Sequence, residues 1–419
     1  MKALSPPRRL AVAVSGGRDS VALLLLCAAY ARQNGSEITA YTVDHGLRPA
    51  SAGEASRVGG WCEPFGIKHV ILLWKGEKPN TGVQAAAREA RYSLLIEAAQ
   101  ADGCEALLTA HTADDQAETV FMRLARGAGV AGLSAIPKES FFAAGAGEPL
   151  RVLRPLLEFT RKDVTSFLEK QGQSFVDDPS NDDPAFERVR VRALLAALEE
   201  QEFVSIEKLC MTADKLALAD AVLCAQEDSL FDALGGCFHS WGGVSVSDWQ
   251  AGRAASGLAR RIIHAVGGGE YPPGEDKAAA AVFQAANTGS ATLAGALVKK
   301  WNGRLWFFRE PSALTGREGV PALSPAPVTK PRVWDRRFIV ERQSATSIAV
   351  GPMGEMAAEF LGPRTGLFQG PREALSSLPG IYAAGKLIGA PALPFMGRSA
   401  ASARCLVTER YQGGIVRFS

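Results

Sequence analysis

The sequence lacks paired cysteines. Its seven cysteines are scattered over 419 residues, and none belongs to a C-x-x-C pair. An odd number of cysteines at irregular spacing favours neither a disulfide framework nor a zinc knuckle. We therefore expect free thiols, mostly buried, in a protein of a reducing compartment.

Long apolar runs are also missing. The apolar segment Leu10–Val14 has five residues, too few for the core of a signal peptide. The run Val21–Tyr30 has ten residues, whereas a membrane-spanning helix needs about 20. These lengths predict a cytoplasmic protein without a membrane partner.

Neither sign of charge is in excess. Lysine plus arginine number 46 and aspartate plus glutamate 44, which gives a net charge of +2. The overall charge therefore does not indicate a nucleic-acid-binding protein, and any such surface must come from local clusters of basic residues. Hydrophobic residues make up 47% and charged residues 21%, as in ordinary globular proteins.

The first half of the sequence alternates short apolar runs with helix-like segments. Strands are expected at Leu10–Val14, Ile38–Val43, His69–Leu73 and Ala106–Ala110, and helices at Asp19–Gln33, Ser51–Phe65, Gln84–Ala101 and Ala113–Arg126. Strands separated by helices predict an α/β, Rossmann-like domain with a parallel sheet covered on both faces. Ligands of such sheets bind at the carboxyl ends of the strands.

The rest of the chain has a different pattern. It is helical from Thr160 to Leu234, with further helices at Ala254–Val266 and Lys277–Ala286 and one candidate strand at Arg304–Phe308. Pro311–Pro331 is the best linker candidate, and short strands with Gly and Pro turns follow it. We predict three domains: an α/β domain over 1–200, a helical middle domain over 201–315, and a small α+β or mostly β domain over 325–419.

A glycine-rich loop joins the first strand to the first helix. It reads Ser15-Gly16-Gly17-Arg18-Asp19-Ser20. The two glycines allow backbone amides to converge on an anion, the helix start adds its positive end, and the serines add hydroxyl donors. The pattern predicts a phosphate-binding loop, but not a Walker A loop, because the G-x-x-x-x-G-K-[ST] spacing is absent.

A second glycine-rich stretch, residues 127–132, formally matches G-x-G-x-x-G. It follows a predicted helix, whereas the dinucleotide-binding fingerprint requires a strand before it. We interpret it as a flexible or tight loop.

Polar clusters follow two other predicted strands. Asp44-His45-Gly46-Leu47-Arg48 has the composition of a site, although a solvated loop is an equal alternative. His111 to Thr119 contains Asp114, Asp115 and Glu118 at the start of a helix. The helix dipole explains only part of this acidity. Three carboxylates near a triphosphate can hold Mg²⁺ or can pair with the amine of a cationic substrate.

Taken together, these motifs resemble those of the tRNA(Ile)-lysidine synthetases, members of the PP-loop ATP pyrophosphatase superfamily. The matching segments are Ser15–Ser20, Asp44–Arg48 with Ser51 and Glu54, Ala87-Arg88 to Arg91-Tyr92, His111–Thr119, Arg126–Leu133, Arg154–Leu157 and Asp178–Asn181. The resemblance is close over residues 8–192, loose over 200–310, and weaker still at 333–335 and 387–395. Val189 and Phe175 depart from the family pattern, which expects Asn and Trp there.

The resemblance implies a two-step reaction. The C2 oxygen of the wobble cytidine in a tRNA(Ile) with a CAU anticodon attacks the α-phosphate of ATP and releases pyrophosphate. The amine of free L-lysine then attacks C2, and AMP leaves. ATP and Mg²⁺ are the implied cofactors, and a homodimer is left open.

The resemblance also assigns roles to residues. Ser15, Gly16, Gly17, Arg18, Asp19, Ser20 and His111 are expected to bind ATP, and Asp19, Asp44, Arg88, Arg91, Asp115 and Glu118 to form the catalytic site. Asp19 and Asp114 are the candidates for Mg²⁺. Asp115 and Glu118 would receive the lysine ammonium. Arg88 and Arg91 would hold phosphate or the activated base, unless they form a solvated helix face.

Two basic clusters are candidates for binding tRNA. Arg188, Arg190 and Arg192 recur within five residues. In the tail, Lys330, Arg332, Arg336, Arg337 and Arg342 surround Trp334 and Phe338. Basic residues interleaved with aromatic ones suit contacts to an RNA backbone and its bases. The alternative for the second cluster is a set of solvated charges on a structural element.

Two other functions remain to be weighed. One is a different PP-loop enzyme, such as a tRNA thiolase or an amide-forming synthetase. A thiolase would be expected to carry paired cysteines, and an amidotransferase a glutaminase signature; the sequence has neither pattern. The other is a non-catalytic tRNA-binding protein, which the intact residues 15–20 and the carboxylates at 114, 115 and 118 disfavour.

Overall fold

The computed structural model describes residues 4–46, 51–75, 83–143, 149–177, 183–247, 249, 252–317, 321–396, 400–412 and 417–418. The chain divides into two compact units, one formed by residues up to 142 with 149–221, the other mainly by residues 222–418. The division falls inside one long helix, α8 (Ile206–Ala233). The predicted C-terminal domain and residues 222–315 of the predicted middle domain lie in the second unit, so the division into three domains stays a prediction.

The first unit is built on a largely parallel sheet. Its strands are β1 (Arg9–Ala13), β2 (Glu37–Asp44), β3 (Lys68–Leu73), β4 (Ala106–Leu108), β5 (Glu139–Ala143) and β6 (Leu150–Leu153). They lie in the order β5–β6–β4–β1–β2–β3, with only β5 antiparallel to its neighbour β6. Leu10, Val12 and Leu108 are fully buried, as expected for central strands covered on both faces. The predicted α/β class is confirmed.

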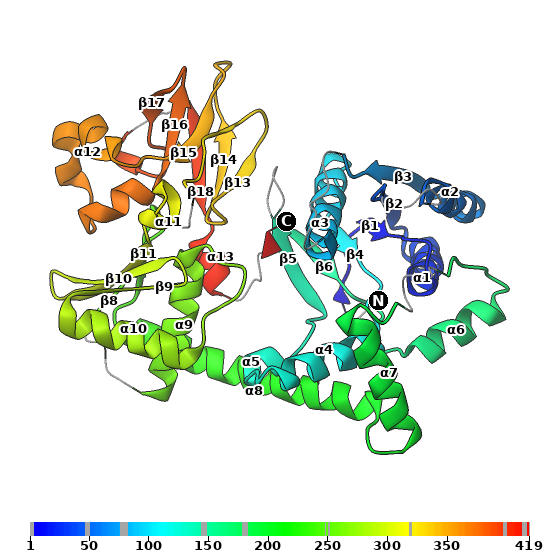
Figure 1. Ribbon diagram of the computed structural model, residues 1–419. Coiled ribbons are helices and arrows are strands. Elements are labelled where there is room, and N and C mark those ends of the chain that lie inside the picture. The colour runs from blue at the N-terminus through cyan, green and yellow to red at the C-terminus, as the bar shows by residue number, and fades with distance from the viewer. Residues whose placement is uncertain are drawn as a thin grey trace. The chain divides into compact units, whose positions relative to one another are not determined.

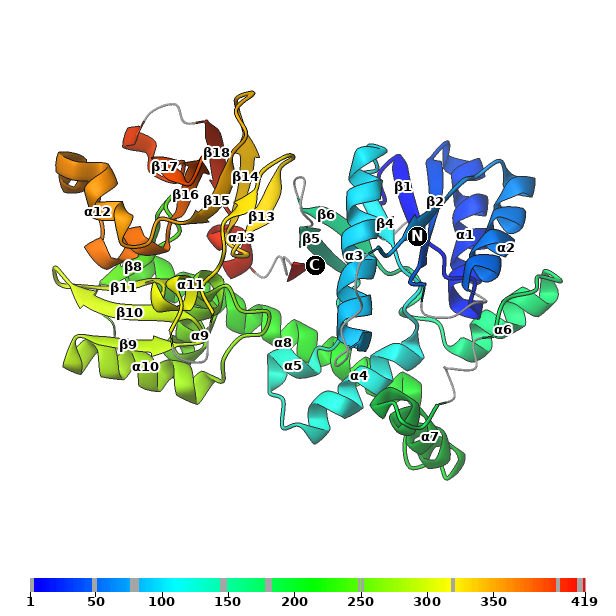
Figure 2. The ribbon, with the colours of Figure 1, turned by 45° about the horizontal axis from the view of Figure 1, so that its top comes forward.

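Helices cover both faces of this sheet. They are α1 (Arg18–Asn34), α2 (Ser51–Cys62) and α3 (Val83–Ala101). The helices α4 (Ala113–Ala125), α5 (Val130–Leu133), α6 (Arg161–Lys170) and α7 (Glu187–Glu200) pack mainly against other helices of the unit. Figure 2 shows α1 and α2 on one face and α3 on the other. This follows from right-handed crossovers, because the connection from β3 to β4 runs back across the sheet. The strand order therefore reverses between β1 and β4, and such switch points are where α/β sheets bind ligands.

The second unit begins with an antiparallel sheet. Its strands are β7 (Cys237–Phe238), β8 (Val244–Ser247), β9 (Ser290–Leu293), β10 (Ala296–Trp301) and β11 (Arg304–Arg309), in the order β7–β8–β11–β10–β9. Helices α9 (Arg253–Gly267) and α10 (Glu275–Thr288) pack on it (Figure 1). The region predicted to be helical thus also contains a sheet, of which the sequence indicated only β11. The strands are short and joined by two-residue turns, Ala294-Gly295 and Asn302-Gly303, whose residues all have positive φ.

The end of the chain is mostly β, as predicted for this region. One sheet has the order β12–β15–β16–β17 and another the order β13–β14–β18. The strands are β12 (Ala326–Pro327), β13 (Arg332–Trp334), β14 (Phe338–Arg342), β15 (Ala349–Pro352), β16 (Pro379–Ala383), β17 (Lys386–Gly389), β18 (Ala401–Cys405) and β19 (Arg417–Phe418). Short helices are α11 (Ser312–Thr315), α12 (Met356–Leu361) and α13 (Val407–Tyr411). No helix in the described ranges is long and apolar enough to cross a membrane.

The predicted stacking surface at residues 330–342 is wrong. Trp334 is 3% exposed and Phe338 is fully buried, and both belong to the core of the C-terminal sheets. Arg337 is 1% exposed, and its Nε donates to Asp335 over 2.6 Å. The Nε and Nη2 of Arg309 also donate to the carboxylate of Asp335, in a bidentate arrangement at 3.0–3.2 Å. The hairpin turns these aromatic side chains inward, so a sequence cluster of basic and aromatic residues did not become a surface cluster.

Asp335 should be important for stability. Changing Asp335 to alanine leaves the buried Arg309 and Arg337 guanidiniums without their carboxylate, and loss of one partner of a buried ion pair costs about 3–5 kcal/mol. We expect a decrease of that size in the free energy of unfolding, measured by urea denaturation. Glu341→Ala, at an exposed position on the adjacent strand β14, is the matched control and should change little. Equal effects of the two changes would mean that the Asp335 network is solvated.

Candidate active site

The loop of residues 15–20 lies at the carboxyl end of β1, beside the switch point of the sheet. Gly16 has φ of +88°, a conformation that residues with a side chain rarely adopt. The Ser20 hydroxyl fixes the loop, because it accepts from the amide of Ser15 over 3.1 Å and donates to the carbonyl of Gly17 over 2.8 Å. Gly17 is the N-cap of α1, and no side chain caps the helix there.

This arrangement is suited to an anion. The first amides of a helix have no partner inside the helix, and the helix dipole makes this end positive. The amide of Val176 donates a hydrogen bond to the carbonyl of Gly16 over 2.9 Å, so the segment after α6 is attached to the loop. The loop therefore retains the open backbone donors that a phosphate group needs, in a fixed geometry.

Asp19 is the acidic member of the loop. Burial raises the pKa of its carboxyl above the usual value, while the nearby Arg18 and Arg161 act in the opposite direction. A further cation would therefore be favourable at this carboxylate. The described residues contain no group of three potential ligands for a metal ion, but Mg²⁺ at nucleotide sites is commonly held by one or two carboxylates together with phosphate oxygens. Asp19 fits that requirement.

Three arginines converge on Glu118, which is 1% exposed. Arg161 and Arg192 donate to its Oε1 over 2.8 and 2.9 Å. The Nε of Arg188 lies 2.9 Å from Oε2. Arg188 and Arg192 are one turn apart on α7, so both face the same carboxylate. Of the basic cluster predicted to contact tRNA, these two arginines instead pair with Glu118, and Arg190 donates to the carbonyls of Pro184 and Ala185.

Asp115 belongs to the same charge cluster. Its Oδ2 accepts from the amide of Thr112 over 2.9 Å, and these two residues form the capping box of α4. Its Oδ1 accepts from Arg161 over 3.1 Å. Burial opposes ionisation of Asp115, but Arg161, together with His111, Arg188 and the amide of Thr112, outweighs this effect and keeps the pKa of the carboxyl below its usual value. Asp114 is engaged separately, because its Oδ2 accepts the backbone amide of Arg161 over 2.7 Å.

Arg161 is the functional candidate that the sequence analysis missed. It contacts Asp115 and Glu118 directly, and its Nε lies 3.9 Å from Asp19. It therefore links the phosphate loop to the carboxylates of α4. Thr160 and Asp163 form a capping box at the start of α6, which places Arg161 at the first position of this helix. The sequence contains one indication of its role. A positive side chain at the first position of a helix is unfavourable beside the positive end of the helix dipole, so Arg161 is expected to pair with an acidic residue elsewhere in the fold.

His111 lies at the carboxyl end of β4, the other strand at the switch point. Its Nδ1 is 3.1 Å from the Thr109 hydroxyl. Burial lowers the pKa of His111 to about 3, and Arg154, Arg88 and Arg91 act in the same direction. His111 is thus a neutral imidazole that can accept or donate a hydrogen bond near a nucleotide.

Arg88 and Arg91 are on α3, and both lie close to the ring of Tyr92, at 5.3 and 5.7 Å from its centroid. Tyr92 in turn stacks on Phe142, with ring centroids 4.6 Å apart. Both guanidiniums are near enough to His111 to influence its pKa. The structure therefore brings α3 to the same side of the sheet edge as the His111 segment.

Asp44 ends β2, and its observed contacts are local. Its Oδ1 accepts from the Gly46 amide over 2.8 Å and from the hydroxyl of Ser51, the first residue of α2, over 2.6 Å. Leu47 and Arg48 lie outside the described residues, as does the segment Asp178–Asn181. The stretch 127–132 follows helix α4, as predicted, and Arg123 donates to the carbonyls of Gly132 and Ala135.

Two buried histidines should make stability depend on pH. Burial lowers the pKa of His111 to about 3 and that of His264, on α9, to about 4, from an ordinary value of 6.5. Both are neutral in the folded protein and take up protons when it unfolds below pH 6.5. Their contribution to the free energy of unfolding is therefore complete above pH 6.5 and is lost as the pH falls. Urea denaturation between pH 7.5 and 5 should show this decrease, with a shallower slope in His264→Gln. An identical slope in that variant would contradict the assignment.

Comparison with known proteins agrees with this geometry. A model of the PP-loop domain matches residues 1–198, which contain the loop, the switch point and the charge cluster, and so the first unit is a PP-loop domain. The chain is 33% identical to the tRNA(Ile)-lysidine synthase of Ruegeria pomeroyi over 392 residues, 92% of this chain and 89% of that protein. It is 35% identical to the one from Mesorhizobium japonicum, over 90% of this chain and 83% of that protein. The chain belongs to the tRNA(Ile)-lysidine synthase family.

Over a shorter part of the chain, identity to a relative is higher. The tRNA(Ile)-lysidine synthase of Rhizobium meliloti is 48% identical over 204 residues, 47% of this chain. The matched part spans about half, 45%, of the length of that relative. Among solved structures, a U34-tRNA thiolase from Methanococcus maripaludis matches with a TM-score of 0.42 and 21% identity, over 50% of this chain and 72% of that one.

Proposed function

We propose that this chain forms lysidine on the wobble cytidine of a tRNA(Ile) with a CAU anticodon. The C2 oxygen attacks the α-phosphate of ATP, and the bond to the β-phosphate breaks with release of pyrophosphate. The amine of L-lysine then attacks C2 and loses a proton, and AMP leaves with the former C2 oxygen. The observation that carries the proposal is the link, through Arg161, between the phosphate loop and the buried carboxylates of α4.

The loop supports the first step. Backbone amides at the start of α1, with the hydroxyl of Ser15, would stabilise the charge that develops on the departing pyrophosphate, because donors held in a fixed loop are already oriented. Mg²⁺ bound by Asp19 with phosphate oxygens would neutralise part of that charge. His111, Arg88 and Arg91 lie toward the carboxyl end of β4 and are suited to the adenosine phosphate or the activated base.

The carboxylates support the second step. Asp115 and Glu118 are the proposed partners of the lysine ammonium. Both oxygens of Glu118 are engaged by guanidiniums in this structure, so lysine can reach that carboxylate only if one guanidinium gives way. Asp115 shares only its Oδ1 with a guanidinium, Arg161. Asp115 is therefore the more accessible of the two for an incoming ammonium.

Asp115→Asn should specifically weaken the use of lysine. A charge-assisted hydrogen bond to the ammonium is worth about 1.5–3 kcal/mol, so the lysine concentration for half-maximal rate should rise about ten- to a hundred-fold. Adenylation of the tRNA should survive better than lysine transfer, which separate assays of pyrophosphate release and lysine incorporation will show. Equal loss of both steps would indicate that Asp115 holds Mg²⁺ instead.

The decisive test is incorporation of lysine. The chain is incubated with ATP, radiolabelled lysine and bulk tRNA, and we expect label in the tRNA with one AMP formed per lysine. Reactions without ATP are the control. Release of pyrophosphate with tRNA but without lysine incorporation would indicate a different PP-loop enzyme, and tRNA binding without pyrophosphate release would indicate a binding protein. We further propose that the chain acts in the cytoplasm, where tRNA, ATP and lysine occur together.

A further inference from the structure

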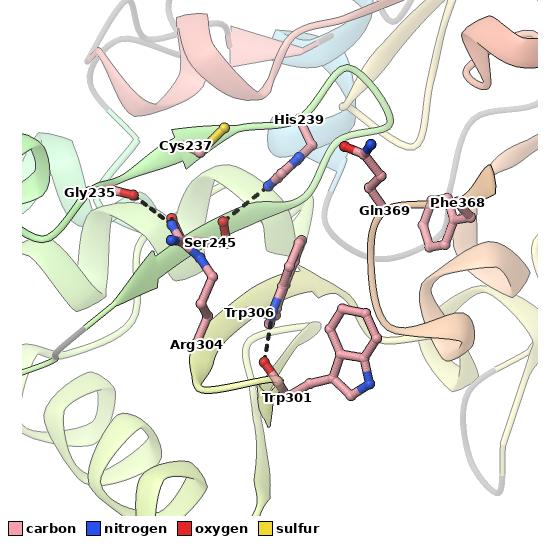
Figure 3. Close-up of a pocket in the computed structure, with 9 residues that line it drawn as sticks. All are labelled: Gly235, Cys237, His239, Ser245, Trp301, Arg304, Trp306, Phe368 and Gln369. Carbon is pink, nitrogen blue, oxygen red and sulfur yellow. Dashed lines mark hydrogen bonds between the residues drawn. The ribbon is translucent and has the colours of Figure 1, made fainter. Parts of the chain in front are cut away.

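A pocket of about 630 Å³ opens on the second unit, at the sheet β7–β11 (Figure 3). Trp301 ends β10, Arg304 and Trp306 are on β11, and His239 follows β7. Phe368 completes the wall. All the lining residues belong to the second unit, and none belongs to the loop or the charge cluster described above. The pocket residues are therefore not among those assigned to the chemistry proposed for the first unit.

The pocket is walled by aromatic rings in fixed positions. His239 and Trp306 are stacked, with centroids 4.9 Å apart and planes inclined by 26°. Trp301 meets Trp306 edge-on at 5.6 Å, and the indole Nε1 of Trp306 donates to the carbonyl of Trp301 over 3.2 Å. Trp241 lies nearly parallel to Trp306 on the buried side, at 6.2 Å. The rings are already ordered, so a flat ligand would not have to order them on binding.

The charge of the pocket comes from one guanidinium. Arg304 is positioned by hydrogen bonds from its Nη2 to the carbonyls of Gly235 and Ser245, at 2.6 and 3.4 Å. Figure 3 shows it alongside Trp306 on the wall of the pocket. No acidic residue is among the nine that line the pocket. The site therefore combines aromatic faces with a single positive charge.

This combination distinguishes between ligand classes. A cationic ligand, which aromatic faces alone would suit, is disfavoured by Arg304. A nucleotide has a flat base for the rings and a phosphate for the guanidinium. The rim residues Cys237 and Gln369 are exposed, so the ligand can remain attached to a longer chain.

We propose that this pocket binds one unpaired nucleotide of an RNA, with the base against the half-buried Trp301, which Trp306 supports from the core, and a phosphate at Arg304. The identity of that RNA as tRNA rests on the proposed function, but the binding chemistry does not. The pocket supplies the aromatic contact to RNA that the sequence had placed at Trp334 and Phe338, which are buried. It would hold the tRNA at a point on a different unit from the reacting cytidine.

The test compares binding of short RNAs to the full chain by fluorescence anisotropy. The probes are a labelled single-stranded pentanucleotide, a labelled base-paired hairpin and unlabelled CMP as competitor. Trp301→Leu removes an aromatic face but keeps an apolar side chain, and Trp301→Phe restores a ring. Stacking of one base contributes about 1–3 kcal/mol, so Trp301→Leu should bind the pentanucleotide about 5- to 100-fold more weakly. Trp301→Phe should recover most of this loss.

Phe283→Ala is the matched control, because Phe283 is a largely exposed aromatic residue on α10 outside the pocket. It should bind the pentanucleotide like the unchanged chain, and Trp301→Leu should bind the hairpin normally. Equal behaviour of Trp301→Leu and Phe283→Ala would overturn the proposal. Competition by CMP as strong as by the unlabelled pentanucleotide would overturn the assignment to RNA in favour of a free nucleotide. Binding is measured without ATP or lysine. The binding result can therefore be interpreted even if the chain does not form lysidine.

Discussion

Asp19→Ala should lower tRNA-dependent release of pyrophosphate by about a hundred-fold or more, the size of effect seen when a preorganised electrostatic contact is removed from an active site. The carboxylate lies at the start of α1, where burial and the two neighbouring guanidiniums of Arg18 and Arg161 oppose each other. Its removal takes away the carboxylate that pairs with Arg18 beside the phosphate loop and also the proposed Mg²⁺ ligand.

Asp276→Ala is the matched control for this prediction. Asp276 occupies the same second position of α10 as Asp19 does of α1, but it is exposed and lies in the second unit. Pyrophosphate release and urea denaturation are measured for both variants. We expect both to stay folded and only Asp19→Ala to lose activity. Near-normal turnover of Asp19→Ala would refute the assignment of the loop.

Glu118→Gln should have the largest combined effect on stability and activity. The change removes the negative charge that three guanidiniums share, and breaking a buried ion pair costs about 3–5 kcal/mol. We expect a decrease of that order in the free energy of unfolding. Lysine incorporation should be lost even under conditions where the variant remains folded, because Arg161, Arg188 and Arg192 would no longer be held in place.

Glu187→Gln provides the comparison, because Glu187 pairs with Arg126 across an exposed surface, with both side chains at least half exposed. Exposed pairs contribute about 0–1 kcal/mol. Urea denaturation and lysine incorporation should therefore be nearly unchanged in this variant. If Glu118→Gln were as stable and active as Glu187→Gln, the charge cluster would have no structural role.

The sequence predicted the first unit well because its patterns are local. The strand expected at Leu10–Val14 is β1 at Arg9–Ala13, and the helix expected at Ala113–Arg126 is α4 at Ala113–Ala125. The strand is indicated by its own apolar run, and the helix by the capping residues at its start. The same holds for the loop of residues 15–20, whose glycines, serines and helix start are contiguous.

Features that depend on distant residues were not predictable in this way. Arg161 meets Asp115 across 46 positions of sequence and Glu118 across 43, and no local pattern specifies such pairs. The burial of Trp334 and Phe338 depends on which face of a hairpin meets the core, which composition does not determine. The hairpin β10–β11 is different, because Asn302-Gly303 is a strong local signal for a two-residue turn.

The contacts of Glu118 also have a consequence for synthesis of the chain. Glu118 is made 74 residues before Arg192, the last of its three partners. At about 5–20 residues per second, translation needs roughly 4–15 s to cover that interval. During this time the nascent chain carries the phosphate loop and α4 but not all of α7, so Glu118 has at most Arg161, made 43 residues after it, as a partner. The strands and the nucleotide loop can therefore form early, whereas closure of the site around Glu118 must await emergence of α7 from the ribosome.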